Sequence, residues 1–202
     1  MSKTNDPSLW LGKMPALQPD GHKYGRGCAV IFGGEHMTGA ARLAAMASMR
    51  IGAGLCILSA PKGTVPLYAS TLPAHIIVEE LHDVKDTLAD ERRNAVLIGP
   101  GLGKNRKRAV IDVVHAGRPA VLDADALTSF EGDPDRFLKE IPSTCVLTPH
   151  EGEFLRLFPH IKGDRVDRAV AAAEAAECVV VLKGAQTIIA SPGMEPVVNM
   201  LD

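Results

Sequence analysis

The sequence predicts an α/β fold of three layers, in which a mainly parallel sheet lies between two layers of helices. Short apolar runs alternate with helix-like segments from Cys28 almost to the end of the chain. These runs are apolar throughout, which is typical of parallel strands that are buried on both faces. The composition agrees with a folded domain, because 46% of the 202 residues are hydrophobic and 23% are charged.

The composition also narrows the classes of partner. The formal net charge is -2 with both signs interspersed, so we expect no nucleic-acid-binding stripe and no basic face for a membrane. The apolar runs are far shorter than the roughly 20 residues that cross a bilayer, and the N-terminus has no signal-peptide pattern, which predicts a cytoplasmic protein. The cysteines lack metal or redox spacing, and we expect buried, reduced thiols at Cys28, Cys56, Cys145 and Cys178.

Residues 1–24 are expected to form a linker or lead-in segment, because they are polar and contain three prolines. Residues 25–202 are expected to form one domain. Its first part should contain strands at 28–32, 54–60, 75–80 and 95–99, a helix at 39–52 and a further segment at 62–70. Apolar residues recur in that helix at steps of three and four, which predicts a buried face of Ala40, Leu43, Ala44, Ala47 and Ile51.

The second part of the chain continues the alternation. We expect helices at 104–116, 125–140, 151–158 and 164–177, and strands at 120–124, 145–149, 179–184, 187–191 and 196–200. An α/β layer fold normally covers such a last strand with a following helix, and the sequence has none after residue 200. We therefore expect that the C-terminal part of the domain is missing from this chain.

The residues after each strand are the first candidates for a site, because ligands of doubly wound sheets collect at the carboxyl ends of the strands. The stretch GGEHMTGAA follows the first strand and ends in a helix start, where bare backbone N–H groups suit phosphate or another anion. It is not a Walker A loop, since Gly39 is followed by Ala40 instead of lysine. A tight turn without a ligand is an equally good interpretation.

A second glycine-rich turn, IGPGLGKN, follows the strand expected at 95–99. It matches neither the dinucleotide nor the phosphate-loop spacing. Glycines such as Gly101 and Gly103 let the backbone pass close to a ligand, although a structural turn needs them equally.

Two carboxylates follow the strand expected at 120–124, in the stretch LDADAL. Asp123 and Asp125 are alternate residues, and alternate residues of a strand point to the same side, so both could converge on a metal, a ribose or a proton. The alternative is that Asp125 caps the next helix.

A histidine follows the next strand, in LTPHEGEF. His150 lacks the second histidine of the HExxH motif, so the pattern does not fit a zinc protease. It is then either a substrate contact or a residue of a helix start, where Glu153 would complement the helix dipole.

A lysine ends the following strand, in VLKGAQT. Lys183 could meet a phosphate as a point charge, while the backbone of Gly184 and Ala185 could hold an adenine or ribose edge. The alternative is a solvated lysine at the end of a strand.

Taken in order, these stretches resemble one enzyme family. The family is that of the ADP-dependent (S)-NAD(P)H-hydrate dehydratases, lyases of the ribokinase-like fold, and the similar stretches are KYGRGCAVIFGGEHMTGAARLAAMASMRIGAGLCIL, VLIGPGLG, AVLDADAL, LTPHEGEF and VVLKGAQT. The resemblance covers about residues 20–199. It implies repair of damaged NADH or NADPH, in which ADP phosphorylates the hydroxyl of the hydrate so that phosphate can be eliminated, with AMP as the second product. The cofactors it implies are ADP and Mg²⁺.

The resemblance also implies roles for individual residues. The hydrate-binding side would be lined by Ala40, Gly103 and His150, with Gly39, Gly101, Asp123 and Asp125 as secondary candidates. The nucleotide side would be lined by Lys183, Gly184, Ala185, Gln186 and Thr187. No metal-ligating set of protein residues is expected. Gly-rich turns and helix starts suit this chemistry, because phosphoryl transfer depends mainly on positioning and charge stabilisation.

The chain departs from the family pattern in two places. Glu35, His36 and Met37 stand where the family commonly has glycine-serine and a tyrosine. The family also continues past VVN into a Gly-rich segment whose Gly-Asp step supplies the expected base, whereas this chain ends at Asp202. No catalytic residue is therefore assigned.

Three functions remain open at this stage. The first is a hydrate dehydratase that is inactive or impaired as given. The second is a non-catalytic nucleotide-binding module or regulatory remnant, with or without a partner chain that completes its sheet. The third is a ribokinase-like kinase for a small metabolite, against which LDADAL and LTPHEGEF argue. Besides the hydrate and ADP, the resemblance implies a homo-oligomer and a fused or separate epimerase as partners.

Overall fold

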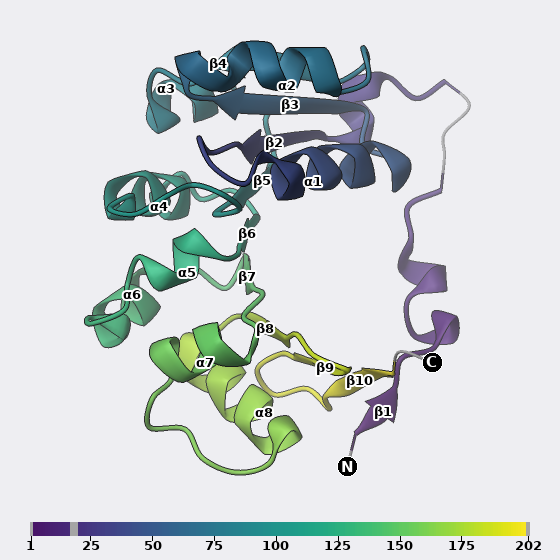
Figure 1. The fold of residues 1–202 in the computed structure, drawn as a ribbon. Coiled ribbons are helices and arrows are strands. Elements are labelled where there is room, and N and C mark those ends of the chain that lie inside the picture. Colours follow the sequence, from purple (N-terminus) through teal and green to yellow (C-terminus); the bar gives the residue numbers. More distant parts are fainter. Residues whose placement is uncertain (1, 17–19, 201–202) are drawn as a thin grey trace.

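The computed structural model describes residues 2–16 and 20–200, and it confirms the expected α/β architecture (Figure 1). One mixed sheet has the strand order β1-β10-β9-β8-β7-β6-β5-β2-β3-β4. Neighbouring strands from β8 to β4 are parallel, while β9 is antiparallel to both β8 and β10. The strands are β1 (Lys3–Thr4), β2 (Cys28–Phe32), β3 (Leu55–Ala60), β4 (Ile77–Glu80), β5 (Ala95–Ile98), β6 (Ala120–Leu122), β7 (Cys145–Leu147), β8 (Val179–Leu182), β9 (Gln186–Ala190) and β10 (Val197–Met200).

The helices connect these strands much as expected. They are α1 (Thr38–Arg50), α2 (Val65–Thr71), α3 (Val84–Leu88), α4 (Lys107–His115), α5 (Asp125–Thr128), α6 (Pro134–Glu140), α7 (Glu151–Leu157) and α8 (Arg165–Ala176), with short 3₁₀ turns at Pro7–Leu9, Leu11–Lys13, Lys23–Arg26 and Lys62–Thr64. The single helix predicted at 125–140 is wrong, because Gly132 with φ +106° and Pro134 divide it into α5 and α6. Helix α3 was not predicted; the Asp83 carboxylate caps its first turn.

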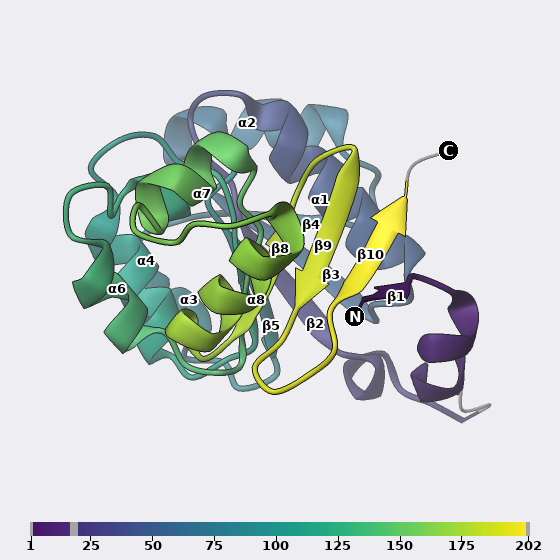
Figure 2. The same cartoon turned by 90° about the horizontal axis from the view of Figure 1, so that it is seen from below.

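The N-terminal segment contributes a strand to the sheet. Lys3 and Thr4 pair in parallel with Val197 and Val198 of β10, and Asn5 donates a side-chain hydrogen bond of 2.8 Å to Asn199. Figure 2 shows β1 beside β10 at this end of the sheet. A two-residue strand carries too little pattern to be recognised from sequence.

Two apolar cores lie on opposite faces of the sheet. Helices α3 to α8 pack on one face, where the larger core includes Phe32, Leu122 and Leu182. Helices α1 and α2 pack on the other face at β2, β3 and β4, where Leu58 and Tyr68 are fully buried. The layers therefore form around one continuous sheet, as parallel strands require.

The second face is covered only in part. Val121, Val146, Val181 and Ile189 alternate with the buried residues of their strands, so they point to the face of α1 and α2. Each is partly exposed, and none packs against either core. Within residues 2–16 and 20–200, no α-helix lies on this apolar stretch (Figure 1). The expected cover on both faces is thus absent over the middle of the described sheet.

The predicted buried face of helix α1 is wrong except at Ala44, which is partly buried against the core on this side of the sheet. Leu43 and Ile51 are 65% and 75% exposed, whereas Ala41 and Ala45 are completely buried against β2 and β3. Apolar residues occur on every side of the helix, so their periodicity alone does not distinguish its faces. Close approach to the sheet selects the small alanine side chains.

The expectation of buried, reduced thiols is confirmed. All four cysteines are free and buried. Burial raises the pKa of Cys145 to about 11 and that of Cys178 to about 12, which makes both thiols poor nucleophiles. No helix in the described part of the chain has the length and apolar character to cross a membrane.

Candidate functional site

All the stretches singled out from the sequence lie along one edge of the sheet. Strands β2, β5, β6, β7 and β8 are mutually parallel, so their carboxyl ends face the same way. Strands β2 and β7 are three strand spacings apart in the sheet, which corresponds to roughly 14 Å at about 4.8 Å per strand. This edge is long enough for a substrate of dinucleotide size.

The glycine turns after β2 and β5 interlock. A Cβ atom on Gly34 would lie 1.4 Å from the carbonyl oxygen of Gly101, and one on Gly99 would lie 1.7 Å from that of Asp123. The buried Tyr68 hydroxyl donates a 3.0 Å hydrogen bond to the Gly34 carbonyl. Glycine is needed at these positions because backbone passes directly against backbone.

The turn after β5 leaves Gly103 open to a ligand. Gly103 has φ +86° and no heavy atom within 4 Å of a Cβ at its position, while its N–H donates a 2.8 Å hydrogen bond to Asp125. It borders an open hollow of about 850 Å³, whose wall includes the basic residues Lys104, Lys107 and Arg156. His150 and Lys183 do not line this hollow.

The two carboxylates of LDADAL do not converge. Strand β6 ends at Leu122, so the alternation of strand side chains stops before Asp123. Ala124 then has φ +47°, a strained value for a residue with a side chain. Asp123 accepts a hydrogen bond of 2.5 Å from the Lys183 ammonium, and Asp125 binds the N–H of Gly103. The alternative of Asp125 as a helix cap is also wrong, because Asp125 is the first residue of α5 and no side chain caps that helix.

His150 lies at the start of helix α7, as the helix-start alternative predicted. Its Nδ1 accepts a 3.2 Å hydrogen bond from the Glu153 N–H, and the Glu153 carboxylate accepts one of 2.8 Å from the His150 N–H. This reciprocal capping box leaves the imidazole 56% exposed at the sheet edge. A capping role and a ligand contact are therefore compatible in the same side chain.

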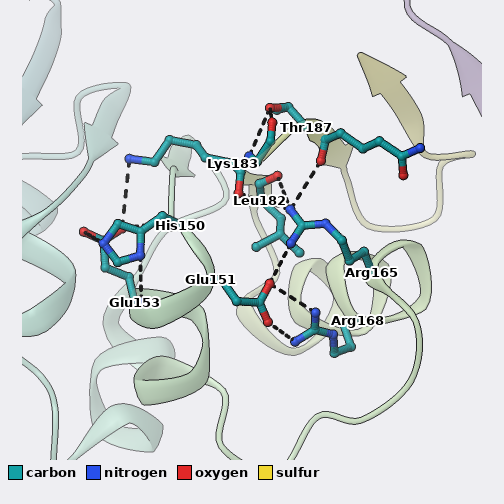
Figure 3. Close-up of polar contacts among 10 residues, drawn as sticks. His150, Glu151, Glu153, Arg165, Arg168, Leu182, Lys183 and Thr187 are labelled. Atoms are coloured by element: carbon teal, nitrogen blue, oxygen red, sulfur yellow. Dashed lines mark hydrogen bonds and ion pairs between the residues drawn. The ribbon is translucent and has the colours of Figure 1, made fainter. Parts of the chain in front are cut away.

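The lysine after β8 joins three of the stretches. The Lys183 N–H donates to the Pro149 carbonyl at 2.9 Å, so β7 and β8 stay paired up to this edge. The Lys183 ammonium binds Asp123. It also lies 4.0 Å from the Glu153 carboxylate (Figure 3). Lys183 is thus not the purely solvated lysine of the alternative interpretation.

The remaining nucleotide-side residues are Gly184 and Ala185, in the turn between β8 and β9, and Gln186 and Thr187, the first two residues of β9. Gly184, Ala185 and Gln186 are exposed, and the Thr187 hydroxyl donates a 3.1 Å hydrogen bond to the Gly184 carbonyl. At the other end of the site, Gly39 and Ala40 lie in the first turn of α1, whose N-cap residue Met37 provides no side-chain hydrogen bond. The first N–H groups of α1 are therefore available to an anion.

Comparison with known proteins decides the family. The family model of the NAD(P)H-hydrate dehydratases matches residues 28–201. The chain belongs to this family. Residue 201 of the match, and Asp202 with it, lie outside the described residues, so the structure does not bear on the end of the chain.

Relatives of known name support this membership. The chain is 33% identical over 187 residues to the ADP-dependent (S)-NAD(P)H-hydrate dehydratase of Bacillus subtilis, covering 89% of this chain and 66% of the relative. It is 34% identical over 200 residues to the bifunctional NAD(P)H-hydrate repair enzyme Nnr of Thermosynechococcus vestitus, covering 92% of this chain and 38% of the relative. The chain thus spans well under half of the bifunctional relative.

Solved structures support the fold. The ADP/ATP-dependent NAD(P)H-hydrate dehydratase of Bacillus subtilis, co-crystallised with ATP and Mg²⁺, matches with a TM-score of 0.75 at 31% identity over 92% of this chain and 68% of that one. A ribokinase-like superfamily protein of Enterococcus faecalis matches with a TM-score of 0.83 at 22% identity, over 98% and 72% of the two chains. The ribokinase-like fold expected from the sequence is confirmed.

An ion-pair cluster of Glu151, Arg165 and Arg168 lies beside the expected site, and the sequence did not reveal it. Arg165 and Arg168 of α8 both bind Glu151, the first residue of α7 (Figure 3). The Arg168 guanidinium lowers the pKa of Glu151, so this carboxylate is ionised at neutral pH. No local motif marks these residues, because their partners lie 14 and 17 positions away in the chain.

Proposed function

We propose that the chain binds ADP and the S form of NADH or NADPH hydrate at the carboxyl edge of the sheet, for dehydration of the hydrate to NAD(P)H. The observation that carries this proposal is the contact between successive stretches along that edge. Gly34 meets Gly101, Gly103 meets Asp125, and Asp123 meets Lys183. Family membership supplies the reaction to which these contacts are assigned.

The edge divides into two sides in this proposal. Ala40, Gly103 and His150 contact the hydrate. The hollow beside Gly103 also contains three basic residues that suit a pyrophosphate, namely Lys104, Lys107 and Arg156. The turn from Lys183 to Thr187 contacts the nucleotide. Lys183 faces a phosphate as a point charge, and its ion pair with Asp123 holds the ammonium at the site before the nucleotide arrives.

The reaction needs a leaving group better than hydroxide. Transfer of the terminal phosphoryl group of ADP to the hydrate hydroxyl breaks the bond to AMP and forms a phosphate ester. Loss of phosphate then breaks the carbon–oxygen bond, while a proton leaves the neighbouring ring carbon and the ring double bond returns. The contribution of this edge is to hold the two substrates in line and to stabilise phosphate charge.

Mg²⁺ is proposed to arrive with the nucleotide. Within the described residues no group of three His, Cys, Asp or Glu side chains could hold a metal ion. Asp123 and Asp125 are each held by another group, so these residues do not fit a protein-built cage. Phosphate oxygens and water are the usual ligands of Mg²⁺ in such sites, and the bound ion would screen phosphate charge.

A second candidate is nucleotide binding without turnover. Each carboxylate of the described site already has a partner: Asp123 pairs with Lys183, Asp125 with Gly103, and Glu153 with the start of α7. Each of these three therefore has a partner that competes with a role as the base in the elimination step. This favours a binding module unless a further group provides the base.

A homo-oligomer is also proposed, along with an epimerase that is fused or separate. Exposed apolar residues on α1 support the oligomer, since Leu43 is 65% and Ile51 is 75% exposed. Light scattering of the wild type and of Leu43→Glu tests it. A wild-type protein that is monomeric at high concentration would contradict this part of the proposal.

One experiment separates the two main candidates. The protein is incubated with NADH hydrate and ADP, and the return of nicotinamide absorbance is followed, while calorimetry measures ADP binding. Turnover supports the dehydratase, and ADP binding without turnover supports the binding module. Lys183→Ala should weaken ADP binding about tenfold or more, since charge-assisted hydrogen bonds are lost. Absence of ADP binding by the wild type would refute both candidates.

A further inference from the structure

Arg165, the first residue of α8, contacts the backbone at the turn between β8 and β9. Its Nη2 atom donates to the carbonyl oxygens of Lys183 at 3.1 Å, Gln186 at 3.3 Å and Leu182 at 3.4 Å. These oxygens lie on both sides of the turn. A single guanidinium group therefore ties the end of β8 to the start of β9 (Figure 3).

Gly184 makes room for this contact. A Cβ atom at Gly184 would lie 2.6 Å from Nη2 of Arg165, so a larger residue there would displace the guanidinium from its present position. Its backbone φ is not in the left-handed region, so the constraint on this position comes from the guanidinium and not from the shape of the turn. The glycine of VLKGAQT and Arg165 thus form one fitted unit.

The other end of the guanidinium is fixed to helix α7. Nη1 of Arg165 donates a 2.6 Å hydrogen bond to Glu151, and Arg168 binds both oxygens of the same carboxylate at 2.5 Å and 3.2 Å. The Arg168 side chain is only 14% exposed and lies over the ring of Phe154. Arg168 therefore anchors Glu151, while Arg165 carries the connection to the turn.

We propose that Arg165 is a positioning residue, which fixes the nucleotide-side turn relative to the start of α7 where His150 lies. The inference rests on the proposed function, since it concerns the two sides of that site. Glu151 is the neighbour of His150, so the path from the hydrate side to the turn runs through Glu151 and Arg165. Arg165 acts through the backbone of the turn and contacts neither substrate. In-line transfer depends on the separation of donor and acceptor, which this path sets.

The test compares two arginines that share one partner. Arg165→Gln removes the contacts with the turn, and Arg168→Gln removes a contact with Glu151 but touches no carbonyl of the turn. Arg165→Lys retains the charge but cannot span three oxygens and a carboxylate. Amide hydrogen exchange at residues 183–187 reports the order of the turn, and calorimetry gives the Kd values for ADP and for the hydrate.

Both Arg165 variants should exchange faster at residues 183–187 and bind ADP about tenfold or more weakly, while the Kd for the hydrate changes less than about twofold. Arg168→Gln should lower the unfolding temperature without either change. Unaltered exchange and ADP affinity in Arg165→Gln would overturn the inference, as would equal effects in Arg168→Gln. If wild-type ADP binding is absent, the proposed function fails, and the exchange data still decide whether Arg165 orders the turn.

Discussion

Replacement of Gly34 by alanine tests the interlocked turns most directly. Gly34 follows β2 and lies against the turn after β5, where the Cβ of alanine would be 1.4 Å from the carbonyl oxygen of Gly101. Gly39 provides a matched control, because a Cβ there meets no heavy atom within 4 Å. Both substitutions add one methyl group in the same short stretch.

The magnitude follows from the geometry. The methyl group at Gly34 must separate from the Gly101 oxygen by about 2 Å to reach 3.4 Å, the lower limit of ordinary contacts. Backbone lies on both sides, so no side chain can rotate away, and we expect the upper end of overpacking costs, about 3 kcal/mol. In a protein of this size this lowers the unfolding temperature by roughly 6–12 °C. Gly39→Ala lies in the first turn of α1 and should stabilise by about 0.5–1 kcal/mol.

Thermal unfolding of both variants measures these effects, and calorimetry with the hydrate and ADP adds a functional readout. Gly34→Ala displaces the turn that carries Gly103, so hydrate affinity should fall while ADP affinity at Lys183 stays within about twofold. An unfolding temperature like that of the wild type, or an equal loss in Gly39→Ala, would refute the reasoning.

Four further substitutions have specific expected outcomes. His150→Ala removes the capping box, so it should destabilise by about 0.5–2 kcal/mol and weaken hydrate binding while sparing ADP; equal loss of both ligands would count against the assignment. The pKa of Glu151 is lowered in the folded state from its ordinary value of 4.5, so the ionised carboxylate stabilises the fold at higher pH and loses this contribution as the pH falls. The difference in unfolding free energy between wild type and Glu151→Gln should therefore shrink below about pH 4.5. A difference that does not change with pH would contradict this. Val180→Thr buries a hydroxyl group and should lower the free energy of unfolding by about 1–3 kcal/mol, whereas Val146→Thr, on the uncovered face, should lower it by less than about 1 kcal/mol. Denaturant unfolding measures both values. A larger loss for Val146→Thr than for Val180→Thr would show that this face is packed.

Much of the fold and the positions of the candidate site could be predicted from the sequence. An apolar run such as 28–32 marks a buried parallel strand, because both faces of such a strand contact other elements. The chemistry-bearing residues after these strands then fall at one edge as a consequence of parallel topology alone. The order of the stretches, from Gly39 to Lys183, indicated the family that the comparisons show.

The partners of the site residues were decided only by the tertiary structure. Asp123 and Asp125 are two positions apart, yet Asp123 binds Lys183 and Asp125 binds the N–H of Gly103. Strand β6 ends at Leu122, so the alternation of strand side chains does not extend to these two residues. Arg165 shows the same limit, since its partners come from α7 and from the turn after β8.

The faces of α1 were likewise decided by packing. Apolar periodicity predicts Leu43 as a core residue, but the close approach of the helix to the sheet buries Ala41 and Ala45 and leaves Leu43 exposed. Local composition and periodicity were enough to predict most strands and helices and the residues that follow each strand, but not β1, α3 or the break between α5 and α6. Three-dimensional proximity determined the ion pairs, the interlocked glycines and the exposed faces, since each depends on segments that are distant in the chain.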